Sequence, residues 1–377
     1  MSSVPAASAY LDNAATTRLW PEALQAMLPW LGECYGNPSG SHRQARRARA
    51  AIDEAREQVA ACVGCGPGDV VFTSGGTEAD NLAVLGVHAA RGGRIVCSAV
   101  EHHAVLHPVE AVGGFTAPVD DDGIVDLQAL PRLLGPGVTL VSVMLANNEV
   151  GAVQPLAEVA ELTRRCSPEA LVHTDAVHGA PSLDLAGAVA PADLVSLSAH
   201  KFGGPQGVGV LVVRPQAKLA PVLHGGPQER GRRPGTQNVA GVVGMAAALV
   251  LTTERRRSWM ADVARRRDRL AAGLRQAVPG LRVTEPAVRV PGTCHVAIEG
   301  VSNEELLLLL DDAGVAASAG SSCASGALEP SHVLTAMGWS PDRAATAVRL
   351  TVGAATTDAE IDHALEVIPA AVEKLRS

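Results

Sequence analysis

The feature of this 377-residue chain that most constrains its fold is an alternation of short apolar runs, rich in valine and leucine, with helical patterns. Six runs have the composition of buried strands, at residues 69–75, 93–99, 138–145, 170–175, 193–199 and 208–213. Helix candidates lie between several of them, at 78–90, 126–134 and 155–166. This alternation is typical of an α/β fold with a mostly parallel sheet flanked by helices on both faces.

The pattern changes near residue 254, where an arginine-rich helical stretch leads into a more irregular α+β region. At about 150 residues per domain, this length suggests two domains, or one large domain with an appendage. We therefore expect a boundary near residue 257. The predicted large domain spans 16–257, and the predicted small domain combines 1–15 with 258–377.

Composition limits the class of protein. A formal net charge of -8 argues against nucleic acid or an anionic membrane as the main partner. No apolar run approaches the roughly 18 residues of a membrane span, and the first residues lack the pattern of a signal peptide. The seven cysteines are scattered and odd in number, which is not typical of a disulfide framework. We expect a cytoplasmic protein.

Lys201 stands out because the chain has 28 arginines and only three lysines, at 201, 218 and 374. It lies in SLSAHKFGGPQG, directly after a predicted strand. Arginine stays protonated, whereas a partly buried lysine can lose its proton and form an imine with a carbonyl. The alternative is an ordinary surface lysine.

Two further polar clusters follow predicted strands. In FTSGGTEADN, Gly75, Gly76 and Thr77 lead into a helix, whose N-terminus suits a phosphate, although this is also a common turn. In VHTDAVHG, Asp175 ends a strand, where an aspartate is also a frequent cap. A phosphate loop, a carboxylate and an isolated lysine at carboxyl strand ends match the needs of pyridoxal 5'-phosphate.

Longer motifs carry a family resemblance. YLDNAATT, GNPSGSH, FTSGGTEADN, VEHHAVL, NNEVG, HTDAVHG, SLSAHKFGGPQGVG, RPGTQN, SAGSSCASGALEPSHVL and VRLTVG occur in order between about residues 10 and 375. In sequence and spacing they resemble the cysteine desulfurases of the NifS/IscS type. The resemblance implies a fold-type I pyridoxal phosphate enzyme that belongs to the class V aminotransferase branch. It also implies that this enzyme converts L-cysteine to L-alanine.

The resemblance also implies roles for individual residues. Lys201 would form the Schiff base, Asp175 would pair with the pyridine nitrogen, and His102 would stack on the ring. Asn148 would lie beside cofactor and substrate, and Arg349 would bind the substrate carboxylate. The phosphate would be held by Gly76, Thr77, Ser198 and His200, with Thr236 reaching it from the neighbouring subunit of a homodimer.

One position departs from the family pattern. The family usually has glutamine where this chain has His178, and that glutamine hydrogen-bonds the phenolic oxygen of the cofactor. A neutral imidazole with its N–H directed at this oxygen would keep the contact, whereas a titrating imidazole would make it depend on pH. We expect the cofactor contact to be retained.

Cys323 distinguishes between the reactions that pyridoxal phosphate supports. It lies among small residues in SAGSSCASGA, and a buried structural cysteine is the alternative from composition alone. The resemblance makes it the thiolate that takes the substrate sulfur as a persulfide and delivers it to an acceptor protein. We expect no resident metal site, and contact of Cys323 with an iron–sulfur cluster only during delivery.

Several readings stay open at this point. Another class V enzyme, such as a cysteine sulfinate desulfinase, selenocysteine lyase, C–S lyase or aminotransferase, would not need Cys323. A catalytically inactive assembly subunit would not need Lys201. The destination of the sulfur is also open among iron–sulfur clusters, tRNA thiolation, DNA phosphorothioation and specialised metabolites.

Overall fold

The structure is a computed structural model that describes residues 8–320 and 330–377. Its centre is a seven-stranded sheet in the order β2-β8-β7-β6-β5-β3-β4. β8 runs antiparallel to both of its neighbours and the other six strands are mutually parallel. The strands are β2 (Val70–Thr73), β8 (Gly209–Val213), β7 (Leu194–Ser198), β6 (Leu171–Asp175), β5 (Val138–Ser142), β3 (Arg94–Ser98) and β4 (Phe115–Ala117). All six predicted runs contain a strand of this sheet, so the predicted α/β fold is confirmed.

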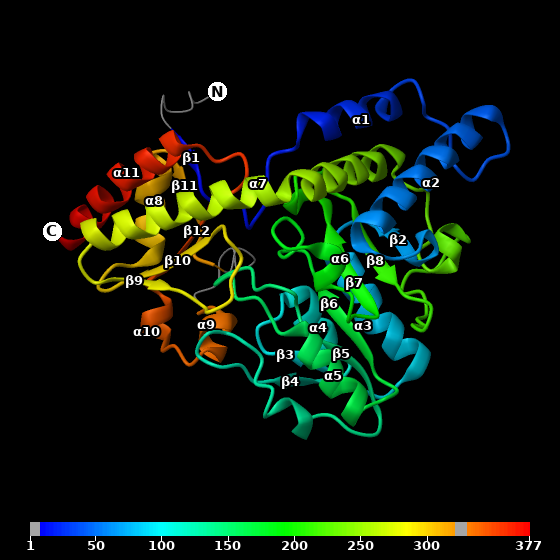
Figure 1. The fold of residues 1–377 in the computed structure, drawn as a ribbon, viewed down its shortest axis with the longest axis horizontal. Coiled ribbons are helices and arrows are strands. Elements are labelled where there is room, and N and C mark those ends of the chain that lie inside the picture. Colours follow the sequence, from blue (N-terminus) through cyan, green and yellow to red (C-terminus); the bar gives the residue numbers. More distant parts are fainter. Residues whose placement is uncertain (1–7, 321–329) are drawn as a thin grey trace.

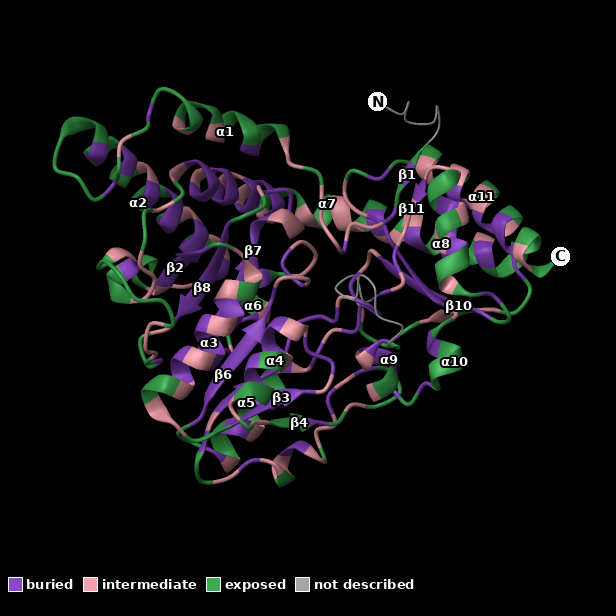
Figure 2. Cartoon of the chain, turned by 180° about the vertical axis from the view of Figure 1, so that it is seen from behind, coloured by how far each residue is buried: buried purple, intermediate pink, exposed green. Residues whose placement is uncertain are grey.

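Helices cover both faces of this sheet because alternate strand residues point to opposite sides. Leu194 of β7 belongs to the apolar cluster under α3 (Gly76–Arg91) and α4 (His103–Ala111). Its neighbour Val195 belongs to the cluster under α2 (Arg43–Val63) and α5 (Leu156–Cys166). Figure 2 shows the buried strands enclosed between helices whose outer surfaces are exposed.

The predicted helix at 126–134 is wrong, and only a short 3-10 turn forms there, at Leu130–Arg132. The carboxylate of Asp126 accepts hydrogen bonds from the backbone N–H groups of Gln128 and Ala129, which fixes a local turn. Pro131 removes a backbone donor, and the Gly-Pro-Gly at 135–137 ends the segment. The other two predicted helices correspond to α3 and α5.

A smaller α+β unit follows the large one. Its antiparallel sheet has the order β12-β10-β9, and the short β1 pairs in parallel with β11. The elements are β9 (Leu281–Thr284), β10 (Thr293–Ile298), β12 (Ala347–Thr351), β1 (Ala9–Tyr10), β11 (Val315–Ala316), α8 (Asn303–Asp312), α9 (His332–Ala336), α10 (Pro341–Ala344) and α11 (Asp358–Arg376). The N-terminal strand therefore packs with the C-terminal region.

One helix joins the two units. α7 (Val239–Ala277) runs without a break through residue 257, and Figure 1 shows it crossing from the large sheet to the lobe that contains α8 and α11. Residues of α7 up to Leu249 belong to the core of the large unit, and residues from Val263 onward belong to the core of the small unit. This separation of the two cores supports a boundary within the helix, and we retain residue 257 as its proposed place.

None of the helices in the described ranges combines the length and the apolar character that crossing a membrane requires. The remaining helical elements are α1 (Pro21–Leu31), α6 (Leu185–Ala188) and three 3-10 turns at Pro67–Asp69, Ala199–Lys201 and Gln228–Gly231.

A buried ion pair fixes the segment that leads to the predicted position of Thr236. The guanidinium of Arg56 on α2 donates to both carboxylate oxygens of Glu229, each at 2.8 Å. Glu229 also accepts from the backbone N–H of Phe72 on β2 and from Gln237. The pair thus ties α2, β2 and the loop before α7 together. Because all these donors surround it, the pKa of Glu229 lies below its ordinary value in spite of burial.

We predict that Glu229→Ala lowers the free energy of unfolding by about 3–5 kcal/mol, because it leaves the Arg56 charge buried without a partner. Urea unfolding of the full chain measures this. The matched control is Asp184→Ala, which removes the exposed partner of Arg256 and should change that free energy by less than about 1 kcal/mol. Equal losses in the two variants would contradict the assigned role of burial.

Candidate active site

A cavity of about 300 Å³ lies at the carboxyl ends of the parallel strands, where loops from the large unit meet the small unit. Ten of the residues singled out from the sequence line it: Gly76, Thr77, His102, Asn148, Asp175, His178, Ser198, His200, Lys201 and Arg349. Two candidate residues are absent from this group, for different reasons. Thr236 is exposed in the loop before α7 and is not among the lining residues of this chain, and Cys323 lies outside the described residues.

Lys201 reaches the cavity from the 3-10 turn that follows β7. Its Nζ donates hydrogen bonds to the backbone carbonyl oxygens of Ala14 and, at 2.9 Å, Ala15. The N-terminal segment that precedes α1 therefore positions this amine. The side chain is partly buried and its amine contacts backbone carbonyl oxygens, so Lys201 is not an ordinary surface lysine.

Asp175 ends β6 and is 5% exposed. One carboxylate oxygen accepts a hydrogen bond from the backbone N–H of Val177 at 2.9 Å. Burial raises the pKa of Asp175 to about 6, although that hydrogen bond and the positive charge of Lys201 act in the opposite direction. A positively charged hydrogen-bond donor placed beside Asp175 would stabilise its ionised carboxylate.

His102 caps the start of α4, where its Nδ1 accepts a hydrogen bond from the backbone N–H of Ala104 at 3.1 Å. Burial and the nearby Lys201 lower the pKa of His102 to about 4. The ring is therefore neutral near pH 7, and its proton lies on Nε2 because Nδ1 is the acceptor. The adjacent His103 also lines the cavity and packs its ring against His332.

The N-terminus of α3 forms one end of the cavity. Gly76 begins this helix directly after β2, so its first backbone N–H groups and its positive dipole end suit an anion. A Cβ at Gly76 would lie 2.9 Å from a methyl carbon of Val177, so a side chain there would collide with the wall of the cavity. Ser198 and His200, at the end of β7, line the same cavity.

Arg349 lies in the middle of β12 and is 1% exposed. Its guanidinium pairs with Asp12 at 2.8 Å and donates to the carbonyl oxygens of Asn148, at 2.9 Å, and Gly320, at 3.1 Å. Its buried Nε has no hydrogen-bond partner among the described residues. The arginine is thus held at the cavity wall with one donor still to be satisfied.

His178 is partly buried, and its buried Nε2 has no hydrogen-bond partner within the described ranges. Burial, Lys201 and Arg349 together lower its pKa to about 3. The imidazole is therefore neutral near pH 7, so it does not titrate there. An unpartnered ring nitrogen at a cavity wall is available to a bound group.

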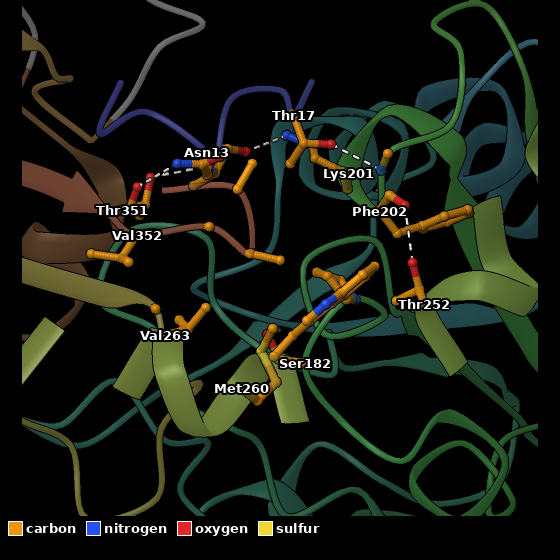
Figure 3. Close-up of a pocket in the computed structure, with 18 of the residues that line it drawn as sticks. Asn13, Thr17, Ser182, Lys201, Phe202, Thr252, Met260, Val263, Thr351 and Val352 are labelled. Carbon is orange, nitrogen blue, oxygen red and sulfur yellow. Dashed lines mark hydrogen bonds between the residues drawn. The ribbon is translucent and has the colours of Figure 1, made fainter. Parts of the chain in front are cut away.

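A second, smaller cavity of about 80 Å³ adjoins the first, and Lys201 and His178 line both. Figure 3 shows it between Met260 and Val263 of α7, Val352 after β12, and Phe202 beside Lys201. Thr252 of α7 donates a hydrogen bond to the carbonyl oxygen of Phe202 at 3.1 Å. The long helix therefore supports the turn that carries the lysine.

Sequence reasoning missed several polar residues of the cavity, namely Asp80, Glu149, His103 and His332, and two carboxylates that support it, the partly exposed Asp12 and the buried Glu101. Each lies inside or next to a quoted motif, but its proximity to the cavity follows only from the tertiary fold. In the described part of the chain, no group of three or more histidine, cysteine, aspartate or glutamate residues is arranged to hold a metal ion.

Comparisons with known proteins identify the family. The model of the aminotransferase class-V family matches residues 9–364. A cysteine desulfurase of Cereibacter sphaeroides is 46% identical over 98% of this chain and 96% of its own length. The cysteine desulfurase IscS of Methanosarcina thermophila is 40% identical over 98% of this chain and 93% of its own length.

Comparison with solved structures supports the same family. A NifS-like protein superimposes with a TM-score of 0.91 at 34% identity, covering 97% of this chain and all of that one. DndA from Streptomyces lividans gives a TM-score of 0.76 at 33% identity, covering 91% of this chain and 99% of that one. The chain therefore belongs to the aminotransferase class-V family and, within it, to the cysteine desulfurases. The family and enzyme class predicted from the motifs are confirmed.

Proposed function

We propose that the protein uses pyridoxal 5'-phosphate to convert L-cysteine to L-alanine, and that the sulfur is left on Cys323 as a persulfide for delivery to an acceptor protein. The observation that carries the proposal is the meeting, in one cavity, of a lysine amine, a buried carboxylate, a helix N-terminus and a buried arginine. Membership of the cysteine desulfurases supports the same reaction.

The residues of the cavity fit this cofactor. Lys201 would hold its aldehyde, Asp175 would pair with the ring nitrogen, and the start of α3 with Ser198 would hold the phosphate. The unpartnered Nε2 of His178 would donate a hydrogen bond to the phenolic oxygen. When bound, the cofactor supplies an electron sink for charge that develops at the substrate's Cα.

The substrate carboxylate would be held by Arg349, whose Nε has no other partner among the described residues. Lys201 would move the proton at the substrate's Cα, since its amine is anchored by two carbonyl oxygens beside the cavity. His102 is neutral near pH 7 and would stack on the ring of the cofactor.

The sulfur step balances without an added oxidant or reductant. The thiolate of Cys323 attacks the substrate sulfur, an S–S bond forms, and the substrate's C–S bond breaks. The carbon that loses sulfur takes up a proton to give the methyl group of alanine. The enzyme thiol and L-cysteine therefore become an enzyme persulfide and L-alanine.

The proposed setting of the reaction follows from composition and family. We propose a cytoplasmic homodimer, in which Thr236 completes the phosphate site of the neighbouring subunit, and a protein acceptor for the sulfur. We propose no direct contact with nucleic acid or membrane. Delivery toward iron–sulfur clusters is the destination we favour, since the names of several relatives include IscS.

We predict that Cys323→Ser lowers alanine formation from L-cysteine by about two orders of magnitude or more, because the sulfur acceptor is lost while the cofactor site remains. Alanine, sulfide and the cofactor absorbance are measured together. The control variant is Cys62→Ser on α2, which should form alanine at the wild-type rate.

Two outcomes would contradict the proposal. Unchanged turnover in Cys323→Ser would favour another class V enzyme, such as a cysteine sulfinate desulfinase. Cofactor absorbance that is absent in the wild type, or equal in the wild type and Lys201→Ala, would favour an inactive assembly subunit.

We predict that Arg349→Lys raises KM for L-cysteine by about 10- to 100-fold, because lysine cannot reproduce a bidentate contact with the carboxylate. The effect on kcat should be smaller, since the carboxylate is held equally in the ground state and the transition state. Steady-state kinetics measures both constants. The control variant is Arg265→Lys, which changes an exposed residue of α7 and should leave KM unchanged. An unchanged KM would remove Arg349 from the substrate site.

We predict that the cofactor absorbance of His178→Gln and of the wild type follow the same profile between about pH 6 and 9. The reason is that the pKa of His178 is about 3, so its charge changes only well below this range. His178→Leu removes the donor and should shift the absorption band in the same experiment. A transition in this range that only the wild type shows would mean that His178 titrates there.

A further inference from the structure

Three buried carboxyl groups gather beneath the catalytic cavity, and the proposed function uses only one of them. Asp175 ends β6, Asp80 lies on α3, and Glu101 follows β3. Asp80 is 1% exposed, Glu101 is fully buried, and Asp80 lines the cavity beside Asp175. Three negative charges so close together in a medium of low polarity would be strongly unfavourable.

The surroundings of Asp80 lack a positive charge. Oδ1 of Asp80 has no hydrogen-bond partner among the residues that the structure describes, and its basic neighbour is Nε2 of His173 at 3.6 Å. That imidazole lies between the hydroxyl oxygens of Ser142, at 2.8 Å from Nδ1, and Ser196, at 2.9 Å from Nε2. Burial lowers the pKa of His173 to about 3, so the ring is neutral and forms no ion pair with Asp80.

Glu101 is held in its neutral form. One oxygen of Glu101 accepts hydrogen bonds from the hydroxyl of Ser98, at 2.6 Å, and the backbone N–H of Met144, at 2.7 Å. Burial raises its pKa to about 8, which keeps it protonated near pH 7. Among the three, Asp175 has the surroundings that favour a negative charge, because it accepts from the N–H of Val177 and faces Lys201.

We propose that Asp80 is a neutral carboxylic acid and a positioning residue for Asp175, and that it leaves the negative charge of the two carboxyl groups on Asp175, which would pair with the ring nitrogen of the cofactor. Burial and the neighbouring Asp175 both raise the pKa of Asp80 well above its ordinary value, in agreement with the geometry. The role toward the cofactor rests on the proposed function, whereas the protonation of Asp80 does not.

A neutral acid at this position has a specific consequence. The hydroxyl of Ser196 hydrogen-bonds to its carboxyl group, and the neutral acid carries a proton near Asp175 without adding a second negative charge. An asparagine amide has nearly the same shape, carries no charge and also donates. Asp80→Asn should therefore preserve the site, whereas Asp80→Ala removes the donor and leaves a gap.

The first test measures urea unfolding of the full chain, freed of cofactor, as a function of pH. Unfolded aspartic acid loses its proton above about pH 4, whereas native Asp80 keeps it. The folded state then binds one proton more than the unfolded state, so raising the pH favours unfolding. Between about pH 4 and the raised pKa of native Asp80, the unfolding equilibrium constant of the wild type should rise relative to that of Asp80→Asn by about tenfold per pH unit, and the ratio should level off above that pKa.

Other titrating groups around Asp80 are the same in both proteins, so they cancel from this ratio to first order. They are Asp175 and His173 on β6, Glu101 after β3, His102 at the start of α4 and Lys201 after β7. The exposed Asp53→Asn on α2 is the control and should give a ratio that does not change with pH.

The second test measures the dissociation constant of pyridoxal 5'-phosphate. Asp80→Asn should bind it within about twofold of the wild type, and Asp80→Ala should bind it at least about tenfold more weakly. A pH-independent ratio in the first test, equal weakening by both variants, or failure of Asp80→Asn to fold would each overturn the proposal. Because unfolding is measured without cofactor or L-cysteine, it is independent of whether the proposed function is correct.

Discussion

The contacts of Arg349 with three separate segments hold the catalytic cavity together. The guanidinium pairs with Asp12 from the N-terminal segment and binds the carbonyl oxygens of Asn148, after β5, and Gly320, after β11. Burying a guanidinium is costly unless most of its donors have acceptors, so the packing of the strand that carries Arg349 depends on the convergence of these segments. The same convergence brings Ala14 and Ala15 to Lys201. The positions of Arg349 and of the Lys201 amine thus depend on one another.

Burial sets the charge state of the cavity. It lowers the pKa of His102 and His178, so both rings are neutral near pH 7, and it raises the pKa of Glu101 to about 8. Lys201 adds to the effect on both histidines because its positive charge opposes a second one nearby. The cavity therefore presents neutral hydrogen-bonding groups around a few fixed charges. Such an arrangement favours a cofactor and a substrate whose own charges match the remaining lysine, arginine and aspartate.

Local patterns made much of this predictable. Lys201 and Asp175 each follow a strand whose buried run is evident from the sequence, and parallel strands bring their carboxyl ends to one edge. The resemblance added Arg349 and His102, whose neighbourhoods lack such signals. The proximity of Asp80 on α3 to Asp175 on β6 was not predictable, because it depends on the order of the strands in the sheet, which the sequence does not show. The segment 126–134 misled because its apolar spacing resembles a helix, while Asp126 and Pro131 impose turns.

The scarcity of lysine reflects a division of labour between two cations. Arg349 must remain charged while deeply buried, and a guanidinium does so because it resists deprotonation and spreads its charge over several donors. In the proposed role Lys201 would lose and regain a proton, which an amine can do and a guanidinium cannot. Arg349 and Lys201 line the same cavity, and both lower the pKa of His178. Exchanging either residue for the other would remove one of these two properties, although the formal charge would be unchanged.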